Sequence, residues 1–562
     1  MKNIVIIDAI STGHNFVEDI IRRGYNPIVF ETNESDSEMA SALRSVYELM
    51  NHKPEIIHEC DDYNDTLEIV RKYDPIAVLA GAETGVVLAT RLSASLGLPG
   101  NSPDNLDKMI RKDSMQEALK QHGIRYIHGC NIHSVEEGLK FCKDNDLTCA
   151  VIKPIHSAGS QGVFLCDNLE EVENAITTLL SMNDMFDKKI TEVVIQERIF
   201  GTEYIVNTMS HNGKHRLNTV LRYKKEKTPE GGYIYDYSEF IDKLEPGHMD
   251  LIEYAFSVAD AIGYRYGSVH GEYMIDEKGP VLIEVNCRPM GGNMPGEFLD
   301  MITGQHETDS ILDCYLDPEK FEIDSKKPYR LYRKGYLKII IVPKELEVYD
   351  HPICEVAKQL RSTFLISAGD ISNIKYYPKT RDLETNGGMI YLINDDNEVL
   401  RSDIELLENA EKKFFQILLS DGTSRRLVPD TSRAATPDAL SIIRQYDCHG
   451  ATLIISEDDT PVEGCQVVTP ATLSDAYKGF DNVITLFGKS LTDMTETQCL
   501  RLMFEIMDKA KCGGRIIIPK CTYEYLSYGR KGAEELMTIK GLMLEAPLPY
   551  KENCVVGTSV RV

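Results

Sequence analysis

Short apolar runs alternate with amphipathic stretches over the first hundred residues of the chain. The apolar runs have the length of buried strands and lie at residues 3–8, 26–32 and 75–83. Residues 14–24 and 84–97 carry apolar positions at helical spacing. Because strands that alternate with helices form parallel sheets covered by helices, this pattern predicts an α/β domain over residues 1–105.

Strand-like runs predominate in the middle of the chain. Residues 104–123 have helical spacing, and residues 148–167 read as a strand, a flexible turn and a second strand. A short strand broken by a glycine follows at residues 192–213, and two strands joined by a turn follow at residues 270–292. A second α/β stretch continues to about residue 420.

A further domain is expected at the end of the chain. Residues 421–438 are rich in turn residues and lack an apolar period, which is typical of a linker. Beyond them, three apolar runs predict short buried strands around a helix at residues 495–510. We therefore expect residues 439–562 to form another α/β domain.

The composition of the chain limits which binding partners and which cellular compartment we expect. The chain has 562 residues and a net charge of −27, which argues against binding to nucleic acid or to an anionic membrane. The apolar run at the N-terminus is too short for a secretory signal or a membrane span. The 14 cysteines are scattered and show no zinc-ligand spacing, so we expect a cytoplasmic protein without a disulfide framework.

The most informative chemistry lies in residues 270–292. Glu284, Asn286 and Arg288 alternate along one predicted strand and so share a face, and Glu272 joins them if the two strands form a hairpin. Carboxylate and amide oxygens suit magnesium bound to a polyphosphate, and the arginine suits a phosphate or a carboxylate. The alternative is that these acids are ordinary surface partners of lysines.

Two other segments carry candidate phosphate and nucleotide contacts. Lys153 precedes a loop of small residues, including Ser157, Gly159 and Ser160, whose backbone N–H groups can surround phosphate oxygens. The alternative is a plain hairpin loop. Gln196, Glu197 and Glu203 flank the bend at Phe200, where backbone groups can meet an adenine edge and a carboxylate can accept from ribose. The turn at residues 11–15 is a weaker candidate phosphate loop, and an ordinary strand-to-helix turn is the simpler interpretation.

Taken together, these ordered motifs show that residues 1–420 resemble the ATP-grasp enzymes. The nearest resemblance is to the carboxylate-amine ligases that include the dipeptide-forming L-amino-acid ligases. This resemblance implies a Rossmann-like domain over residues 1–105, an ATP-grasp domain over 106–325 with a lid at about 145–210, and the rest of the body over 326–420. It also implies ATP and Mg²⁺ or Mn²⁺ as cofactors.

The resemblance assigns a role to each matched residue. Lys112, in RKDSMQEAL, and Lys153 would reach the nucleotide phosphates, while Glu197 and the backbone of Arg198 and Phe200 would meet adenine. Glu203 would meet the ribose. The implied metal ligands are Glu272, Glu284 and Asn286. The implied substrate contacts are Arg288, at the reacting carboxylate or acyl phosphate, with Glu83, Gly291 and Gly292.

The tail resembles a class I methyltransferase fold, with a late strand-helix-strand pattern and a Gly-Gly turn. The strand that should open onto a glycine-rich cofactor loop has no glycine triplet. We therefore interpret residues 439–562 as a degenerate domain that serves for docking or dimerisation.

The predicted reaction is amide formation through an acyl phosphate, with release of ADP and phosphate. The partners would be a small-molecule carboxylate and an amine, both amino acids or similar compounds, and a homo-oligomer is compatible with this. Two alternatives stay open: a carboxylase-type enzyme that uses bicarbonate, and a nucleotide-binding scaffold without turnover.

Overall fold

The computed structural model describes most of the chain. The described residues are 1–33, 54–155, 162–183, 189–227, 233–345, 352–367, 379–420 except 382 and 384, 439–519 except 447, 458–459 and 487–495, 542–544 and 554–559. The chain divides into two compact units. The first holds residues 1–339, 380–386 and 391–397, and the second holds the remainder.

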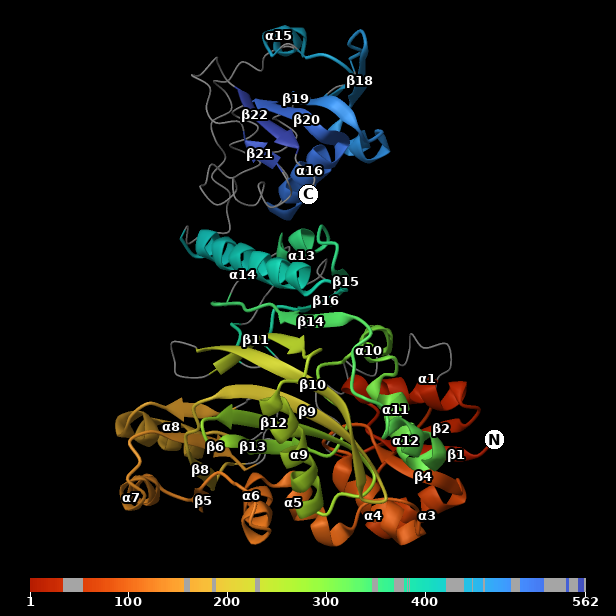
Figure 1. Ribbon diagram of the computed structural model, residues 1–562, viewed down its shortest axis with the longest axis vertical. Coiled ribbons are helices and arrows are strands. Elements are labelled where there is room, and N and C mark those ends of the chain that lie inside the picture. Colours follow the sequence, from red (N-terminus) through yellow and green to blue (C-terminus); the bar gives the residue numbers. More distant parts are fainter. Residues whose placement is uncertain are drawn as a thin grey trace. The chain divides into compact units, whose positions relative to one another are not determined.

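The N-terminal part of the first unit is a parallel sheet with the strand order β3-β2-β1-β4. Its strands are β1 (Asn3–Ile7), β2 (Asn26–Glu31), β3 (Glu55–His58) and β4 (Pro75–Ala80), and the helices between and after them are α1 (Asn15–Arg22), α3 (Tyr63–Lys72) and α4 (Val86–Leu96). Most apolar side chains of β1, β2 and β4 are buried. The predicted α/β pattern is therefore confirmed (Figure 1).

The helical stretch expected at residues 104–123 is present, but it is broken at Arg111, so the chain forms two helices there. They are α5 (Leu106–Ile110) and α6 (Lys112–Gln121). Arg111 between them has extended backbone, with φ −106° and ψ 124°, and its guanidinium pairs with Asp113. The break places Lys112 in the first turn of α6.

A small antiparallel sheet follows, with the strand order β5-β8-β6-β7. Its strands are β5 (Gly129–Ile132), β6 (Ala150–Pro154), β7 (Phe164–Cys166) and β8 (Val193–Glu197). Helices α7 (Val135–Asp144) and α8 (Leu169–Ser181) pack on it around a shared apolar core. The predicted strand, turn and strand at residues 148–167 correspond to β6 and β7.

The large sheet of the first unit has the order β13-β12-β9-β10-β11-β14-β16. Its strands are β9 (Thr202–His211), β10 (Lys214–Lys227), β11 (Tyr233–Phe240), β12 (Gly267–Asp276), β13 (Gly279–Asn286), β14 (Lys334–Ile339) and β16 (Met389–Asn394). Helix α9 (Pro246–Ala261) begins with a capping box between Glu245 and His248 and packs on the sheet. Tyr273 is fully buried in that core.

Three helices follow the large sheet: α10 (Gly296–Thr303), α11 (Glu307–Leu316) and α12 (Pro318–Asp324). Helix α11 packs against α1, as Figure 1 shows, and Phe16 and Ile20 of α1 share one buried cluster with Ile311 and Leu312 of α11. The N-terminal sheet is thus held firmly against the body that carries residues 270–292.

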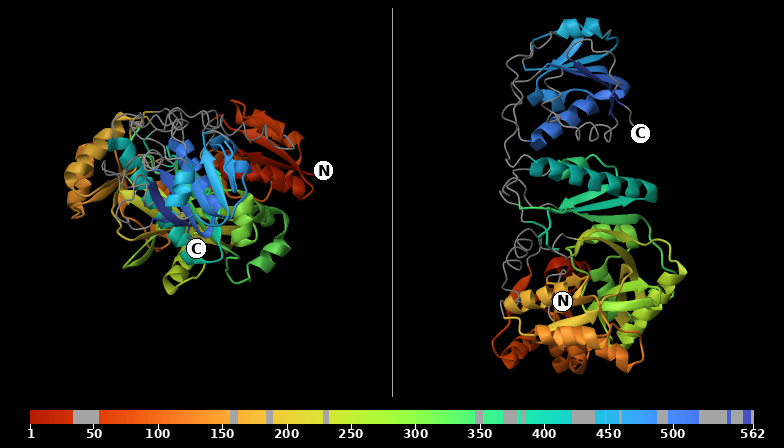
Figure 2. Two further views of the ribbon diagram at one scale, coloured as in Figure 1. Left: turned by 90° about the horizontal axis from the view of Figure 1, so that it is seen from above. Right: turned by 90° about the vertical axis from the view of Figure 1, so that its left-hand side faces the viewer.

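The second unit contains α13 (Pro352–Ala357), β15 (Thr363–Ser367), most of α14 (Asn397–Ser420) and the tail. The tail sheet has the order β18-β17-β19-β20-β22-β21 and is visible in Figure 2. The strands of this sheet are β17 (Thr452–Ser456), β18 (Cys465–Val468), β19 (Phe480–Leu486), β20 (Ala510–Pro519), β21 (Leu542–Leu544) and β22 (Cys554–Ser559), and the helices of the tail are α15 (Ala439–Gln445) and α16 (Glu496–Lys509).

The predicted strands and helix of the tail are confirmed. Strands β17 to β20 pair in parallel, while β22 runs antiparallel to β20. The Gly-Gly turn predicted in the tail is wrong, because both glycines lie within strand β20. The likeness to a methyltransferase stays a prediction, and the expected linker at residues 421–438 lies outside the described residues. No helix in the described part of the chain is long and apolar enough to cross a membrane.

Candidate active site

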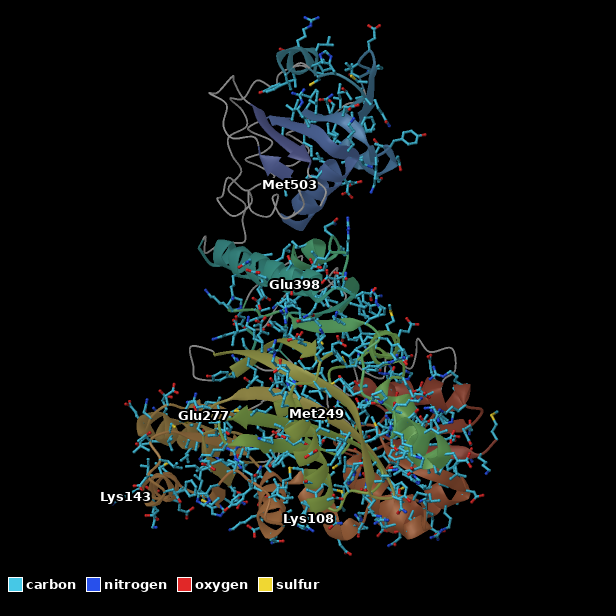
Figure 3. The ribbon with its side chains drawn as sticks, viewed as in Figure 1. Lys108, Lys143, Met249, Glu277, Glu398 and Met503 are labelled. Carbon is cyan, nitrogen blue, oxygen red and sulfur yellow. The ribbon has the colours of Figure 1, made fainter. Side chains whose placement is uncertain are left out.

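Residues 270–286 form the hairpin that the alternation of polar positions predicts. Strands β12 and β13 pair antiparallel, with Glu272 opposite Glu284 and His270 opposite Asn286. Directly opposed residues on an antiparallel pair project to the same face. Glu277, by contrast, lies in the turn between the strands and is exposed (Figure 3). The two glutamates are therefore not ordinary surface acids.

Basic side chains surround the paired glutamates. Lys112 Nζ lies 3.0 Å from Glu284 Oε2, and both side chains are largely buried. Lys153, on β6, is 3% exposed, and burial lowers its pKa to about 8. Burial favours the neutral acid at Glu272, but His270 and Lys225 outweigh that effect and keep the pKa of Glu272 below its ordinary value. Buried positive and negative side chains therefore offset one another's charge in this site.

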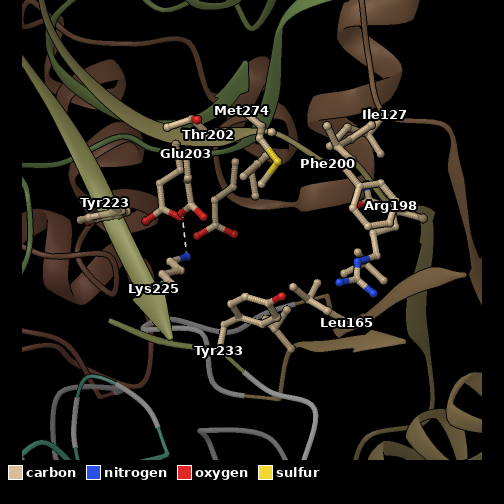
Figure 4. A pocket seen from close by; sticks show the side chains of 18 of the residues that line it. Ile127, Leu165, Arg198, Phe200, Thr202, Glu203, Tyr223, Lys225, Tyr233 and Met274 are labelled. Atoms are coloured by element: carbon tan, nitrogen blue, oxygen red, sulfur yellow. Dashed lines mark hydrogen bonds and ion pairs between the residues drawn. The ribbon is translucent and has the colours of Figure 1, made fainter. Parts of the chain in front are cut away.

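A cavity of about 460 Å³ opens beside this hairpin, between the small sheet and the large one. Its lining combines apolar side chains, among them Ile127, Leu165 and Met274, with the charged side chains of Lys153, Glu203, Lys225, Glu272 and Glu284. Figure 4 shows Arg198 and Phe200 at one end and the Glu203–Lys225 pair at the other. Such a cavity suits a ligand with a flat apolar group and an anionic tail.

The bend between β8 and β9 forms the apolar end of the cavity. Glu197 accepts a hydrogen bond from the backbone N–H of His128 at 2.9 Å, which fixes its carboxylate. Arg198 pairs with Asp167, and its guanidinium lies 4.8 Å from the ring centre of Phe200. Phe200 is 64% exposed at the rim. The side chain of Arg198 thus lines the cavity, where the sequence analysis gave a role only to its backbone.

Lys225 is a residue that the sequence analysis did not single out. Its Nζ lies 2.6 Å from Glu203 Oε1 and 4.3 Å from the ring centre of Tyr235. The pairing of β10 with β11 is irregular between Lys224 and Lys225. Irregularities of this kind redirect side chains near functional sites. Because the redirection depends on strand pairing, the run RYKKEK gives no sign of it.

Arg288 meets Glu83 at the far end of the hairpin. The guanidinium Nε lies 3.3 Å from Glu83 Oε2, although 204 residues separate the two. Burial raises the pKa of Glu83, and the nearby charges of Arg288 and Lys112 offset only part of this effect. The structure therefore brings Glu83 into the site, as the resemblance implies.

The loop after Arg288 is fastened to the N-terminal sheet. Thr12 Oγ1 accepts from the backbone N–H of Met294 at 2.9 Å, and Ser11 Oγ accepts from that of Asn293 at 3.2 Å. The turn at residues 11–15 is the strand-to-helix turn that the sequence analysis favoured, and it contacts this loop. Glu307, at the start of α11, accepts from the backbone N–H of Met290 at 3.0 Å.

The turn that carries Glu83 is held by a buried aspartate. Asp8 Oδ1 accepts from the backbone N–H of Thr32, and Oδ2 accepts from the hydroxyl groups of Thr32 and Thr84. Gly13 approaches the carbonyl of Gly81 so closely that a Cβ at Gly13 would lie 2.2 Å from the oxygen. These contacts fix the spacing between the first turn and Glu83.

The donor set fits a hard divalent cation that arrives with a nucleotide. Glu272 and Glu284 are opposed on neighbouring strands, and Asn286 adds an amide oxygen on the same face. Among the described residues, no group of three or more His, Cys, Asp or Glu side chains forms a self-sufficient metal site. A metal at this place would therefore take its remaining ligands from phosphate oxygens.

A family model described as an ATP-grasp domain matches residues 147–296, which include β6, the bend and the hairpin. The chain contains an ATP-grasp domain. It is also similar to dapdiamide A synthase of Enterobacter agglomerans, with 26% identity over 430 residues, 74% of this chain and 98% of that protein.

Solved structures agree on the ATP-grasp fold. An L-amino acid ligase from Bacillus licheniformis superposes with a TM-score of 0.57 at 18% identity, over 73% of this chain and 97% of that one. An N5-carboxyaminoimidazole synthase from Aspergillus clavatus, in complex with ADP and a ribonucleotide, superposes with a TM-score of 0.54 at 14% identity, over 73% and 99%. At these identities the likeness shows the fold alone.

The structure brings most of the expected site residues together around one cavity and one hairpin. The expected site residues that line the cavity are Lys153, Gln196, Glu197, Arg198, Phe200, Glu203, Glu272 and Glu284. Lys112 reaches it through its ion pair with Glu284, whereas Arg288 and Glu83 pair at the far end of the hairpin. Ser157, Gly159 and Ser160 lie outside the described residues. Their roles, and those of the other site residues, stay predictions.

Proposed function

We propose that the protein is an ATP-dependent carboxylate-amine ligase that forms an amide bond through an acyl phosphate. The observation that carries this proposal is the opposed pair Glu272–Glu284 beside a nucleotide-sized cavity, with Arg288 and Glu83 at the far end of the same hairpin. The pair suits metal and phosphate, and the far end suits the reacting carboxylate and amine. The ATP-grasp domain supports this function, as does the similarity of the chain to a dapdiamide A synthase and to an L-amino acid ligase.

The first step is attack of a substrate carboxylate oxygen on the γ-phosphorus of ATP, which releases ADP. A carboxylate is a poor electrophile, and phosphorylation turns one of its oxygens into a leaving group. Lys112 and Lys153 would neutralise charge on the transferred group, and Arg288 would orient the acyl phosphate. An amine then attacks the carbonyl carbon and expels phosphate. Positioning and electrostatics account for catalysis, so no protein nucleophile is needed.

Glu272, Glu284 and Asn286 are the residues that would hold Mg²⁺ or Mn²⁺. The bound metal would supply positive charge between the phosphate oxygens. Lys225 adds a further positive charge at the end of the cavity that the phosphates would occupy, and its ion pair with Glu203 holds it there. The apolar end, with Ile127 and Leu165, would take the adenine ring.

The substrates that we propose are amino acids or compounds like them. The L-amino acid ligase, by its name, joins L-amino acids, and dapdiamide A synthase, by its name, forms dapdiamide A. This chain is similar to dapdiamide A synthase over nearly that protein's whole length. Residues 439–562 would then add a non-catalytic domain to the ligase body.

The test compares two glutamates of the same hairpin. Glu284→Ala removes a proposed metal ligand and is expected to abolish ADP release, whereas Glu277→Ala, in the exposed turn, is expected to leave it unchanged. ADP would be measured with pairs of amino acids and other carboxylates, with and without bicarbonate, and the products identified by mass spectrometry. Normal turnover in Glu284→Ala would refute the metal assignment, and ADP release that requires bicarbonate but no amine would indicate a carboxylase.

A further inference from the structure

The hairpin contains a β-bulge immediately before Glu284. Glu272 lies opposite Glu284, but the next residue of β12, Tyr273, lies opposite Leu282, so Ile283 is an extra residue in β13. A bulge bends its strand and redirects the side chains beside it, and bulges are frequent next to active sites. The direction of the Glu284 side chain therefore depends on how this bulge is held.

Two side chains hold the backbone of Leu282, at the start of the bulge. Among the described strands, β13 is at the edge of the large sheet, so one side of its backbone has no neighbouring strand. Gln116 Nε2 donates to the carbonyl oxygen of Leu282 at 2.9 Å, and Tyr254 Oη accepts from the N–H of Leu282 at 3.0 Å. Gln116 lies on α6 and Tyr254 on α9, and both helices pack against β13. The strand is thus fixed from two helices.

Each of these side chains is oriented by a second hydrogen bond. Gln116 Oε1 accepts from the backbone N–H of Ile127 at 2.8 Å. Tyr254 Oη donates to the carbonyl oxygen of Arg125 at 2.6 Å. Because a backbone N–H can only donate and a carbonyl can only accept, these partners allow one orientation of the Gln116 amide and one of the Tyr254 hydroxyl. Gln116 is 6% exposed, and its removal would leave two buried backbone groups unpaired.

Gln116 also connects the bulge to Lys112. The two residues are four positions apart on α6, so they lie on the same side of the helix. Lys112 Nζ is 3.0 Å from Glu284 Oε2, and Gln116 holds Leu282, two residues earlier in β13. Helix α6 is therefore joined to β13 on both sides of the bulge. Loss of the bond at Leu282 would let Glu284 shift relative to Lys112.

We propose that Gln116 and Tyr254 are positioning residues, which hold the bulge of β13 so that Glu284 meets the metal while Lys112 meets the transferred phosphate. Neither residue is among those that line the nucleotide cavity. A displacement of about 1 Å in a site of this kind can slow a reaction roughly a hundredfold. This inference rests on the proposed ligase function, and it concerns the placement of Glu284 and not the identity of the metal ligands.

The test removes each bond to Leu282 with a substitution that nearly preserves side-chain size. At saturating ATP and substrates, Gln116→Met and Tyr254→Phe should each lower kcat for ADP release about tenfold, with KM for the carboxylate and the amine within about twofold. Tyr329→Phe is the matched control, because Tyr329 Oη also donates to a backbone carbonyl, that of Ile241 at 2.8 Å, and accepts from a backbone N–H at 3.5 Å. Gln121→Met, at an exposed position of α6, is the control for the glutamine. Both controls should keep the wild-type kcat.

Calorimetric titration of ADP, with and without Mg²⁺, provides a measurement that needs no turnover. Magnesium is expected to tighten ADP binding to the wild type, and the ratio of the two Kd values should fall about tenfold in Gln116→Met and in Tyr254→Phe. The melting temperature of each variant is recorded alongside. Because the two variants act from different helices, either one carries the test if the other does not fold.

Two results would overturn the inference while leaving the ligase function intact. One is a lower melting temperature with the wild-type kcat and the wild-type effect of magnesium on ADP binding, because the bonds to Leu282 would then stabilise the fold without placing Glu284. The other is a higher KM for a substrate with kcat unchanged. If the wild type releases no ADP with any amine, the ligase function fails instead, and the effect of magnesium on ADP binding decides: its loss in both variants supports the positioning role, and its retention refutes it.

Discussion

His306 joins the N-terminal sheet to the body of the first unit, and its replacement gives a prediction with a calculable size. Its Nε2 lies 2.9 Å from both carboxylate oxygens of Asp19 on α1, and its Nδ1 lies 2.8 Å from Asp300 on α10. Only the protonated ring can donate from both nitrogens. Burial alone would lower the pKa of His306, but the hydrogen bonds to Asp19 and Asp300 outweigh it and raise the pKa to about 9.

The sign of the pH dependence follows from this shift. The unfolded chain has a histidine pKa near 6.5, so the folded state binds the proton more tightly between pH 6.5 and 9. The extra stability is fully present below pH 6.5 and is lost as pH rises through about 9. At 1.36 kcal/mol for each unit, and after some allowance for solvent screening, the contribution is about 2 to 3 kcal/mol. We expect His306→Gln to lose this amount at pH 6.

Scanning calorimetry from pH 6 to pH 10 measures this effect through the transition of the first unit. At pH 6 the variant should melt roughly 3 to 6 °C below the wild type, and the two curves should converge near pH 9.5. His133→Gln, at an exposed histidine, is the control and should show no such convergence. A difference that stays constant, or that grows with pH, would show that the proton on His306 does not stabilise the fold.

Three further predictions concern the site and its supports. Lys225→Met should raise KM for ATP about tenfold in the ADP-release assay, because it removes a cation from the anionic end of the cavity; an unchanged KM would exclude phosphate contact. Burial raises the pKa of Glu307 to about 7, so its ionisation favours unfolding as pH rises from 4.5 to 7. Glu307→Gln should therefore raise the melting temperature at pH 8 but not at pH 4.5, and a loss of stability at pH 8 would contradict this. Gly13→Ala should destabilise by about 1 to 3 kcal/mol, because its Cβ would meet the backbone of Gly81, whereas Gly247→Ala has open space and should not.

Alternation along strands explains why the hairpin could be predicted from the sequence. Side chains on a strand have a period of two, so the spacing of Glu284 and Asn286 fixes their common face before any partner is known. Arg288, which was expected on the same strand, lies two residues beyond the end of β13. The turn at Gly279, where φ is +98°, then returns the chain so that Glu272 meets Glu284. Where the chemistry depends on local period and one short turn, sequence reasoning was sufficient.

Other parts of the site depend on tertiary contacts that cannot be recognised from the local sequence pattern. The helical period continues through residues 104–123, yet the backbone becomes extended at Arg111 and thereby places Lys112 against Glu284. Lys225 reaches the cavity through an irregularity in the pairing of β10 with β11. Both features result from tertiary packing, which overrides the pattern that a single segment shows.

The first turn of the chain and the loop after Arg288 have backbone conformations that their local sequences disfavour. Asp8, Ser11 and Asn293 are non-glycine residues with φ near +50°, a conformation that costs such residues free energy. Ser11 and Asn293 lie together because Ser11 Oγ accepts from the N–H of Asn293, while Asp8, three residues before Ser11, is held by its bonds to Thr32. A conformation that the local sequence disfavours persists only when surrounding contacts determine it. The backbone of the turn after Arg288 is therefore set by its contacts with the N-terminal sheet and not by its local sequence.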